Sequence, residues 1–471
     1  MKRVPLLEAI LLCAIVLLVN AGTLGEGMLH GRWDASLISS TQTGEDELRY
    51  LAKIREAAEG KWMFGNHALK EYSETTFSPS GFVEWIPAVM LRAFHWNFGR
   101  MLLFTDLLCT ALVAWLTLVW LKKFITSPLL VWACMFVLFF TFYGGSLDGL
   151  LRDAVPKFAQ PFLSLYVLLL ALPGRQKWVQ TVLRSLLIGL MYYIYPYHWT
   201  LAFGCEGLLW LYVLGTRWNG SIKGMLPLAL SHGAAAFLPF VILAAPLTII
   251  RHRVLQAPEL ADFYSRYHIV STHIPAAPVL QLQVFTALVV LVGAVIYAWK
   301  AGHDKRELLI ARYLPLLLPL VAMLTLLNAN VITGKDPEWL GHGGRVIMPI
   351  ATVAVFAAME RVLRLKQVSI IGSVLLLLFG LNGIASASQE YRRTHEGYKA
   401  WTQSSERRVL LWLDRNVAAE SIIAAPPLAL GIDPGLHLAL PLLQCRGAPL
   451  LRLGRRDHRS LPWLGYALPE R

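Results

Sequence analysis

Charged residues are scarce in this chain: of its 471 residues, only 15% are Asp, Glu, Lys or Arg. A soluble protein of this length would carry roughly a quarter. Hydrophobic residues make up 56% of the chain, and the mean hydropathy is +0.52. The shortage of charge excludes an ordinary soluble domain and indicates an all-α polytopic membrane protein.

Cysteine is scarce as well, at five residues. Four of them lie inside apolar segments and Cys445 stands alone, with no CxxC pair. This pattern indicates neither a disulfide framework nor a cysteine-based metal site. No internal repeat or low-complexity tract is visible.

The net charge of +13 is concentrated between the apolar segments. Such clusters of Lys and Arg are typical of cytoplasmic loops. No basic helix with interleaved aromatic residues occurs, so nucleic acid is not an expected partner. The clusters are Lys2 and Arg3, Lys122 and Lys123, Arg175 and Lys177, Arg217 and Lys223, Lys300 to Arg312, and Arg361 to Lys366.

Apolar segments of about 16 to 24 residues are long enough to cross a hydrocarbon core of about 30 Å as helices. We expect about 11 transmembrane helices, with the N-terminus cytoplasmic, the C-terminus extracytoplasmic and every basic cluster inside. Their expected ranges are 4–20, 99–121, 128–143, 158–172, 181–196, 198–215, 226–250, 280–299, 313–328, 345–359 and 368–386.

Two segments allow a second interpretation. Residues 4–20 can be a signal peptide, because Val19-Asn20-Ala21 resembles a cleavage site. The run "YYIYPYHW" leaves almost no loop around Pro196, and a re-entrant pair there would preserve the direction of the later spans. In either case we expect a transmembrane domain over residues 1–386 and an extracytoplasmic segment over 387–471.

Asp106 and Glu206 fall inside expected spans. An ionisable side chain at the centre of a bilayer costs at least about 2.5 kcal/mol on insertion scales. We therefore expect both side chains to face the interior of the bundle.

The long first external loop, residues 21–98, contains the stretch "TGEDELRYLAKIREAAEGKW". It predicts a short amphipathic helix that begins near Thr43, with the carboxylates Asp46 and Glu47 in its first turn. These carboxylates can simply complement the helix dipole. However, Glu47 projects toward the apolar face, and loops beyond about 12–15 residues are usually functional. A carboxylate here suits general-base chemistry on a sugar hydroxyl, or metal binding at a lipid-linked phosphate.

The same loop contains the apolar stretch "GFVEWIPAVMLRAF". Glu84, Pro87 and Arg92 interrupt its apolar character, which favours a helix lying at the membrane interface over a span.

"DELRY" after the first span, "EGKW" and the Pro-containing interfacial helix together resemble the GT-C-type glycosyltransferases. That superfamily includes protein mannosyltransferases, aminoarabinose transferases and oligosaccharyltransferases, which take sugars from polyprenyl-linked donors at the extracytoplasmic face. The resemblance covers the architecture of most of the chain, although its motif is only a few residues long. It implies that Asp46 is catalytic with Glu47 as its neighbour, and that the protein lies in a bacterial cytoplasmic (inner) membrane.

The second external loop, "YGGSLDGLLRDAVPK", offers Asp148, Arg152 and Asp153. The resemblance implies an acidic residue in this loop that assists a metal or the acceptor, with Arg152 facing a phosphate. The alternative is a locally paired Arg–Asp cluster, worth about 0–1 kcal/mol if it is exposed.

A later external loop, "NANVITGKDPEWLGHGGR", places Lys335, His342 and Arg345 within reach of a lipid phosphate. It resembles a loop of uncharacterised bacterial polysaccharide-associated membrane proteins, with Trp339 and His342 in the aromatic and His places. In this chain the His follows the Trp by three residues, which departs from the usual adjacency. Alternatively, Arg345 anchors the next span by snorkelling.

The tail opens with "SSERRVLLWLDRNV", which predicts an amphipathic helix, and continues with "ESIIAAPPLALGI", which predicts a short strand and a turn. This order is similar to the start of external domains in oligosaccharyltransferase-type GT-C proteins. We therefore expect a small C-terminal α/β segment.

The resulting hypothesis is a membrane glycosyltransferase that moves a sugar from a polyprenyl-linked donor to an extracytoplasmic glycan, lipid or protein. Whether a divalent cation such as Mg or Mn takes part is left open; Asp46 and Asp153 would hold it. The alternative is a non-enzymatic protein of envelope polysaccharide assembly or lipid-linked glycan transport. A transporter would show half-repeats or broken helices with midplane charges, and the scarcity of such features favours the enzyme.

Overall fold

The computed structural model describes residues 6–33, 45–61, 82–143, 155–172, 177–217, 222–255, 282–300, 303–333 and 339–416. Within these ranges the chain is almost entirely helical and contains no strand. The expected all-α class therefore holds for the described part. The strand expected in the tail lies outside it.

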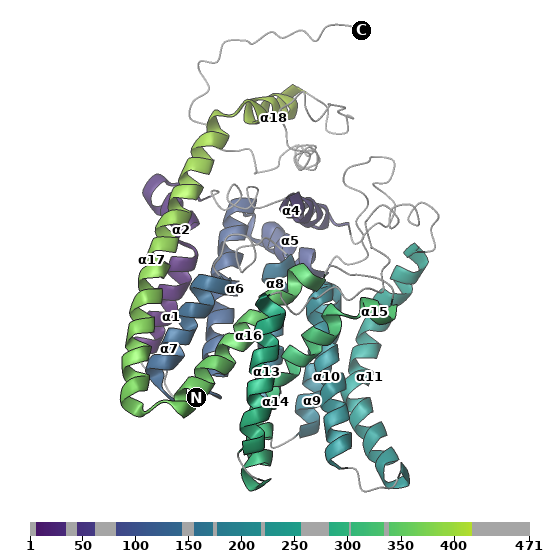
Figure 1. Ribbon diagram of the computed structural model, residues 1–471. Coiled ribbons are helices and arrows are strands. Elements are labelled where there is room, and N and C mark those ends of the chain that lie inside the picture. Colours follow the sequence, from purple (N-terminus) through teal and green to yellow (C-terminus); the bar gives the residue numbers. More distant parts are fainter. Residues whose placement is uncertain are drawn as a thin grey trace.

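The helices follow one another through the body shown in Figure 1. The first half comprises α1 (Leu6–Val19), α2 (Ala21–His30), α4 (Glu45–Ala58), α5 (Phe82–Phe94), α6 (Phe98–Leu121), α7 (Pro128–Val137), the π-helix η2 (Leu138–Tyr143), α8 (Val155–Ala171) and α9 (Lys177–Ile194). The second half comprises α10 (Pro196–Thr216), α11 (Ile222–Leu255), α13 (Leu282–Lys300), α14 (His303–Leu327), α15 (Asn330–Thr333), α16 (Trp339–Val362), α17 (Leu365–Gln403) and α18 (Ser405–Asn416).

Several helix boundaries follow from local chemistry. The side chain of Asn97 accepts a hydrogen bond of 2.9 Å from the backbone N–H of Arg100 and so caps α6. Ser127 caps α7, and Pro128 follows at the first helical position. Pro196 likewise occupies the first turn of α10, so the chain reverses directly after α9.

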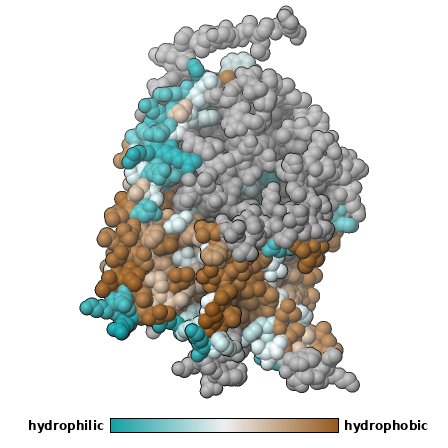
Figure 2. Space-filling view, viewed as in Figure 1, coloured by the Kyte–Doolittle hydropathy of each residue, from teal (hydrophilic) through white to brown (hydrophobic). Residues whose placement is uncertain are grey.

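Four described helical segments are long and apolar enough to cross a membrane. A fifth would be the pair α1 and α2, which is bent by 80° at Asn20. Figure 2 shows a corresponding band of hydrophobic surface across the visible face of the body. The four segments are Phe98–Leu121, Met225–Ile250, Arg312–Thr333 and Leu365–Gln403. The protein is thus a multi-pass helical membrane protein, while the total of 11 spans stays a prediction.

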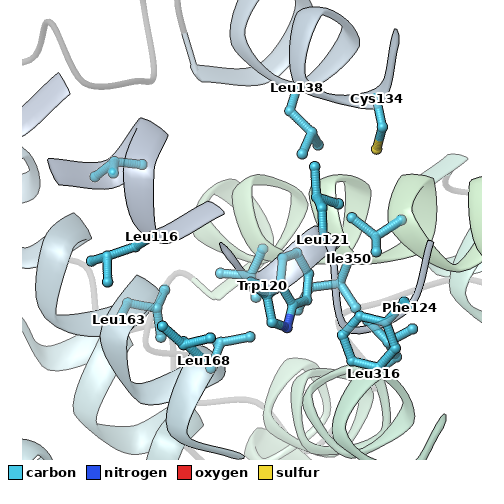
Figure 3. Packing of buried hydrophobic residues seen from close by; sticks show 14 of the residues in the cluster. Leu116, Trp120, Leu121, Phe124, Cys134, Leu138, Leu163, Leu168, Leu316 and Ile350 are labelled. Atoms are coloured by element: carbon cyan, nitrogen blue, oxygen red, sulfur yellow. The ribbon is translucent and has the colours of Figure 1, made fainter. Parts of the chain in front are cut away.

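The centre of the bundle is a large apolar cluster. Trp120, Leu121 and Phe124 at the end of α6 pack against side chains of α8, α14 and α16, including Leu163, Leu316 and Ile350. Figure 3 shows these side chains directed toward one another. This apolar core occupies the middle of the bundle, between its two ends.

One end of the bundle carries Lys122, Arg312 and Arg361, which belong to basic clusters expected in the cytoplasm. There Lys122 forms an ion pair of 2.6 Å with Glu8 at the start of α1. Glu360 near the end of α16 accepts hydrogen bonds of 2.9 Å from the backbone N–H of Thr126. We call this the basic end. The opposite end carries α4 and α5, and we call it the loop end.

Helix α17 is far longer than a membrane requires. Its 39 residues span about 58 Å at 1.5 Å per residue, against a hydrocarbon core of about 30 Å. Its upper part is hydrophilic in Figure 2 and continues directly toward α18. The boundary expected between residues 386 and 387 therefore falls inside one continuous helix. The amphipathic helix expected in the tail is confirmed as α18.

Candidate functional site at the loop end

Helices α4 and α5, from the segment expected to form the first external loop, make one unit over the end of the bundle. Helix α4 contacts α5, and α5 in turn contacts α6, α8 and α9. Leu51 and Ile54 of α4 are fully buried and share an apolar cluster with Val83 of α5. The bundle supplies Phe98, Met101, Leu102, Cys109, Phe158, Ala159, Ile194 and Tyr195 to the same cluster. The apolar face expected for α4 is confirmed at Leu51 and Ile54, and it docks on protein.

The opening carboxylates lie where the sequence predicts them along the chain. Asp46 and Glu47 fall in the first turn of α4, which begins at Glu45. Their side chains, like the whole of Thr43, lie outside the described part of the structure. The capping role and the direction of Glu47 therefore stay predictions.

Glu84 is the carboxyl that the described structure singles out at this end. It lies in the first turn of α5, which is confirmed as a helix, and is 2% exposed. Burial raises the pKa of Glu84 to about 7, while the positive charge of Lys53 on α4 and a hydrogen bond from the Glu84 backbone act in the opposite direction. A carboxyl with a pKa near neutrality can both accept and release a proton at physiological pH. Glu84 is therefore suited to general acid–base chemistry.

From the sequence alone, Glu84 is only one sign that this stretch forms an interfacial helix. The signal that could have identified it is its position among Val83, Pro87 and Ala88, which are also buried. A single acidic residue on the buried side of an apolar helix must pair, stay protonated or serve a site. Which side of α5 is buried depends on how α4 docks, and that is not visible in the local pattern.

A buried ion pair lies beneath α5, between α6 and α8. Lys157 Nζ pairs with Asp106 Oδ1, and both side chains are almost inaccessible. The expectation that Asp106 faces the interior is confirmed. Lys157 was not singled out from the sequence, because it follows a polar external loop and precedes the apolar part of α8.

A second buried ion pair lies deeper in the bundle, half-way along its two helices. Arg184 of α9 contacts Glu206 of α10, with 3.2 Å between Nη2 and Oε2. Tyr166 of α8 donates hydrogen bonds to Glu206 Oε1 (3.2 Å) and to the carbonyl oxygen of Ala202 (3.0 Å). The interior placement expected for Glu206 is confirmed. Its partner Arg184 was not singled out, because one basic residue in an amphipathic helix resembles a loop-proximal charge.

The remaining predicted site residues are not brought together by the described structure. Asp148, Arg152, Asp153 and Lys335 lie outside the described residues. His342 and Arg345 fall in the first two turns of α16, and their side chains lie outside the described part. Their grouping around a phosphate stays a prediction, as does cation binding by Asp46 and Asp153.

A cleft opens between α6, α8, η2 and α16 within the membrane-spanning body. Its cavity volume is about 40 Å³, which is room for only a few water molecules. Gln160 and Ser164 of α8 and Thr117 of α6 place polar atoms in a lining that is otherwise largely apolar. The other lining residues are Trp120, Tyr143, Leu163, Val167, Val346, Pro349 and Ile350.

No protein-family model matches the chain, and a search of curated proteins finds no significant match. The function is therefore argued from the residues and the chemistry that they can perform.

Proposed function

We propose that the chain is a GT-C-type membrane glycosyltransferase, which transfers a sugar from a polyprenyl-linked donor to a glycan, lipid or protein acceptor outside the bacterial cytoplasmic membrane. In this proposal the loop end is extracytoplasmic and the basic end is cytoplasmic. The observation that carries the proposal is the docking of α4 and α5 over the bundle, which sets carboxyl groups at one end of a membrane-embedded body.

The proposed reaction needs a base at the acceptor hydroxyl. A carboxylate of Asp46, supported by Glu47, takes the hydroxyl proton while the oxygen attacks the anomeric carbon of the donor sugar. The bond between that carbon and the phosphate oxygen breaks, and the polyprenyl phosphate leaves with the electron pair.

The polar groups of the other external segments complete the proposal. Asp148 or Asp153 would assist a metal or the acceptor, Arg152 would face a phosphate, and Lys335, His342 and Arg345 would hold the donor phosphate. A divalent cation, if one takes part, would stabilise the negative charge on the phosphate. Cationic side chains and metal ions are the usual partners of phosphate groups at membrane surfaces.

The buried pair of Arg184 and Glu206 favours one rival, a non-enzymatic transporter of lipid-linked glycans. Transporters place charges near the midplane of broken helices. Both groups lie half-way along their helices, and α1 and α2 form a bent pair. The neutrality of the pair and its hydrogen bonds to Tyr166 fit a structural role equally well, so the enzyme remains our proposal.

The test is the profile of envelope glycans and lipid-linked intermediates in a deletion strain. We expect the deletion to remove one sugar from a glycan and to accumulate the polyprenyl-linked donor, with rescue by the wild type and not by Asp46→Asn. Glu59→Gln is the matched control, because Glu59 is an exposed carboxylate at the other end of α4 and pairs with Arg55. A complete glycan accumulating on its lipid carrier would support the transporter instead. Rescue by Asp46→Asn would remove the catalytic role of Asp46.

A further inference from the structure

A cluster of metal-binding side chains lies where α2 meets the upper part of α17. It comprises Glu26 and His30 of α2 and His395 of α17. The three potential donor atoms all lie within 4.8 Å of one another. Because His395 is 30 residues beyond the start of α17, it lies about 45 Å along that helix and beyond the hydrocarbon core. Figure 1 shows α2 beside this part of α17.

We infer that Glu26, His30 and His395 form a binding site for a divalent transition metal of the zinc class. Two imidazoles and one carboxylate are a ligand set that Zn²⁺ accepts, with a fourth position left for water. This site shares no residue with the carboxylates of α4 or of the second external loop. It is therefore independent of the proposed transferase chemistry.

The carboxylate of Glu26 is held in place for such a role. Its side chain is fully buried, and its Oε2 accepts a hydrogen bond of 3.1 Å from Arg32 Nη1. The guanidinium of Arg32 is itself fixed, with its Cζ lying 4.6 Å from the centre of the Tyr398 ring. The other oxygen, Oε1, faces both imidazoles. A carboxylate oriented by an outer-shell hydrogen bond on one oxygen, with its other oxygen turned toward the remaining ligands, is suited to bind a metal.

The distances place the two imidazoles close to ligating positions. From Glu26 Oε1, His395 Nδ1 is 2.7 Å away and His30 Nε2 is 3.8 Å away. Two ligand atoms at about 2.05 Å from a tetrahedral metal lie about 3.3 Å apart. Each imidazole therefore has to move by about half an ångström to accept the metal. His30 and His395 are 35% and 37% exposed, so their rings have room to move.

The backbone around the cluster is held by close packing of glycines. A Cβ added at Gly22 would lie 2.5 Å from Thr394 Oγ1, and one at Gly25 would lie 2.5 Å from Tyr391 Cδ2. Only glycine therefore lets α2 approach α17 this closely. The Tyr391 hydroxyl lies 3.2 Å from His30 Nε2, so it has to give up this contact when the nitrogen binds a metal. A metal here would fasten the bent α1–α2 pair to α17.

The experiment is Zn²⁺ binding to the full chain in detergent after treatment with a chelator, followed by calorimetry. We expect the wild type to bind one equivalent and to unfold at a higher temperature with Zn²⁺ than without it. His30→Ala and His395→Ala should each weaken binding by more than about 100-fold, beyond the range of outer-shell changes. His252→Ala, which removes an exposed imidazole from α11, is the matched control and should bind as the wild type does.

Two further measurements distinguish a metal site from a cluster whose side chains only hydrogen-bond to one another. Gly25→Ala removes no donor atom but should weaken binding by about 10-fold, because it displaces the ligands. Co²⁺ in place of Zn²⁺ should give the visible absorption of a tetrahedral site, and His395→Ala should abolish it. The inference is wrong if the wild type binds no Zn²⁺, or if the His30 and His395 variants bind it as tightly as the His252 variant. Folding of each variant is checked by circular dichroism and by its elution in detergent.

Discussion

Four ionisable side chains at the loop end are much more deeply buried than the ion pair of Lys122 and Glu8 at the basic end. At the basic end, the side chain of Lys122 is 43% exposed in its pair with Glu8. At the loop end, Glu26, Glu84, Asp106 and Lys157 are all buried. An exposed ion pair contributes little to the free energy of folding. Burying a charge costs several kcal/mol of desolvation free energy, which its partner has to offset. The loop end thus retains buried ionisable groups at an energetic cost that function would explain.

The largest expected effect at the loop end comes from breaking the buried ion pair. Asp106→Ala leaves the cation of Lys157 without this carboxylate, and removing one partner of a buried pair costs about 3–5 kcal/mol. We expect poor yield and a lower unfolding temperature in detergent. The double variant Asp106→Leu with Lys157→Leu should recover most of this loss. A single variant as stable as the wild type would show that the pair is not buried as described.

The next effect depends on pH and concerns Glu84. Its pKa is raised from 4.5 to about 7, so its carboxylate destabilises the fold progressively as pH rises through this range. The full penalty above pH 7 is about 3 kcal/mol, at 1.36 kcal/mol per pKa unit. Glu84→Gln should therefore raise the unfolding temperature at about pH 8 and change it little at about pH 4.5. Equal shifts at both pH values would contradict the burial of Glu84.

A smaller loss of stability is expected at the basic end when Glu360 is substituted. Its carboxylate accepts hydrogen bonds from the backbone N–H groups of Thr126 and Ser127, just before α7. Glu360→Ala should cost about 1–2 kcal/mol, in the range of a lost helix cap. Thermal unfolding in detergent measures this loss. It should not depend on pH above the titration range of an ordinary carboxylate, in contrast to the Glu84 variant.

The smallest effect is expected from Lys122. Lys122→Ala breaks an exposed ion pair with Glu8, worth about 0–1 kcal/mol. Added salt should reduce even this difference, because it screens exposed charges. A loss as large as that of Asp106→Ala would mean that the two ends do not differ in the way described.

Local patterns in the sequence predict much of this architecture. The membrane class, the helices of the first loop, α18 and the interior placement of Asp106 and Glu206 all follow from composition and periodicity. These features depend on residues within one or two helical turns, which is why a local pattern contains them. The number of membrane spans is harder to predict, because several apolar helices are too short to cross a membrane fully.

Local sequence patterns cannot predict the polar clusters, because the residues of each cluster are distant in the chain. His395 Nδ1 meets Glu26 Oε1 across 369 residues. Arg184 and Lys157 acquire their partners only through helix packing, and Glu84 becomes buried only when α4 docks. A local pattern shows that a charge is present, but the tertiary fold decides whether it is exposed, paired or protonated.

The most direct test of the account compares one carboxylate from each end in the same deletion strain. The measurement is the amount of glycan product per amount of membrane-inserted protein, for Asp46→Asn and for Glu360→Gln. The account predicts that Asp46→Asn inserts normally and makes no product, while Glu360→Gln makes less protein but the normal product per protein. Normal product from Asp46→Asn, or lost product per protein from Glu360→Gln, would contradict the assignment of the chemistry to the loop end.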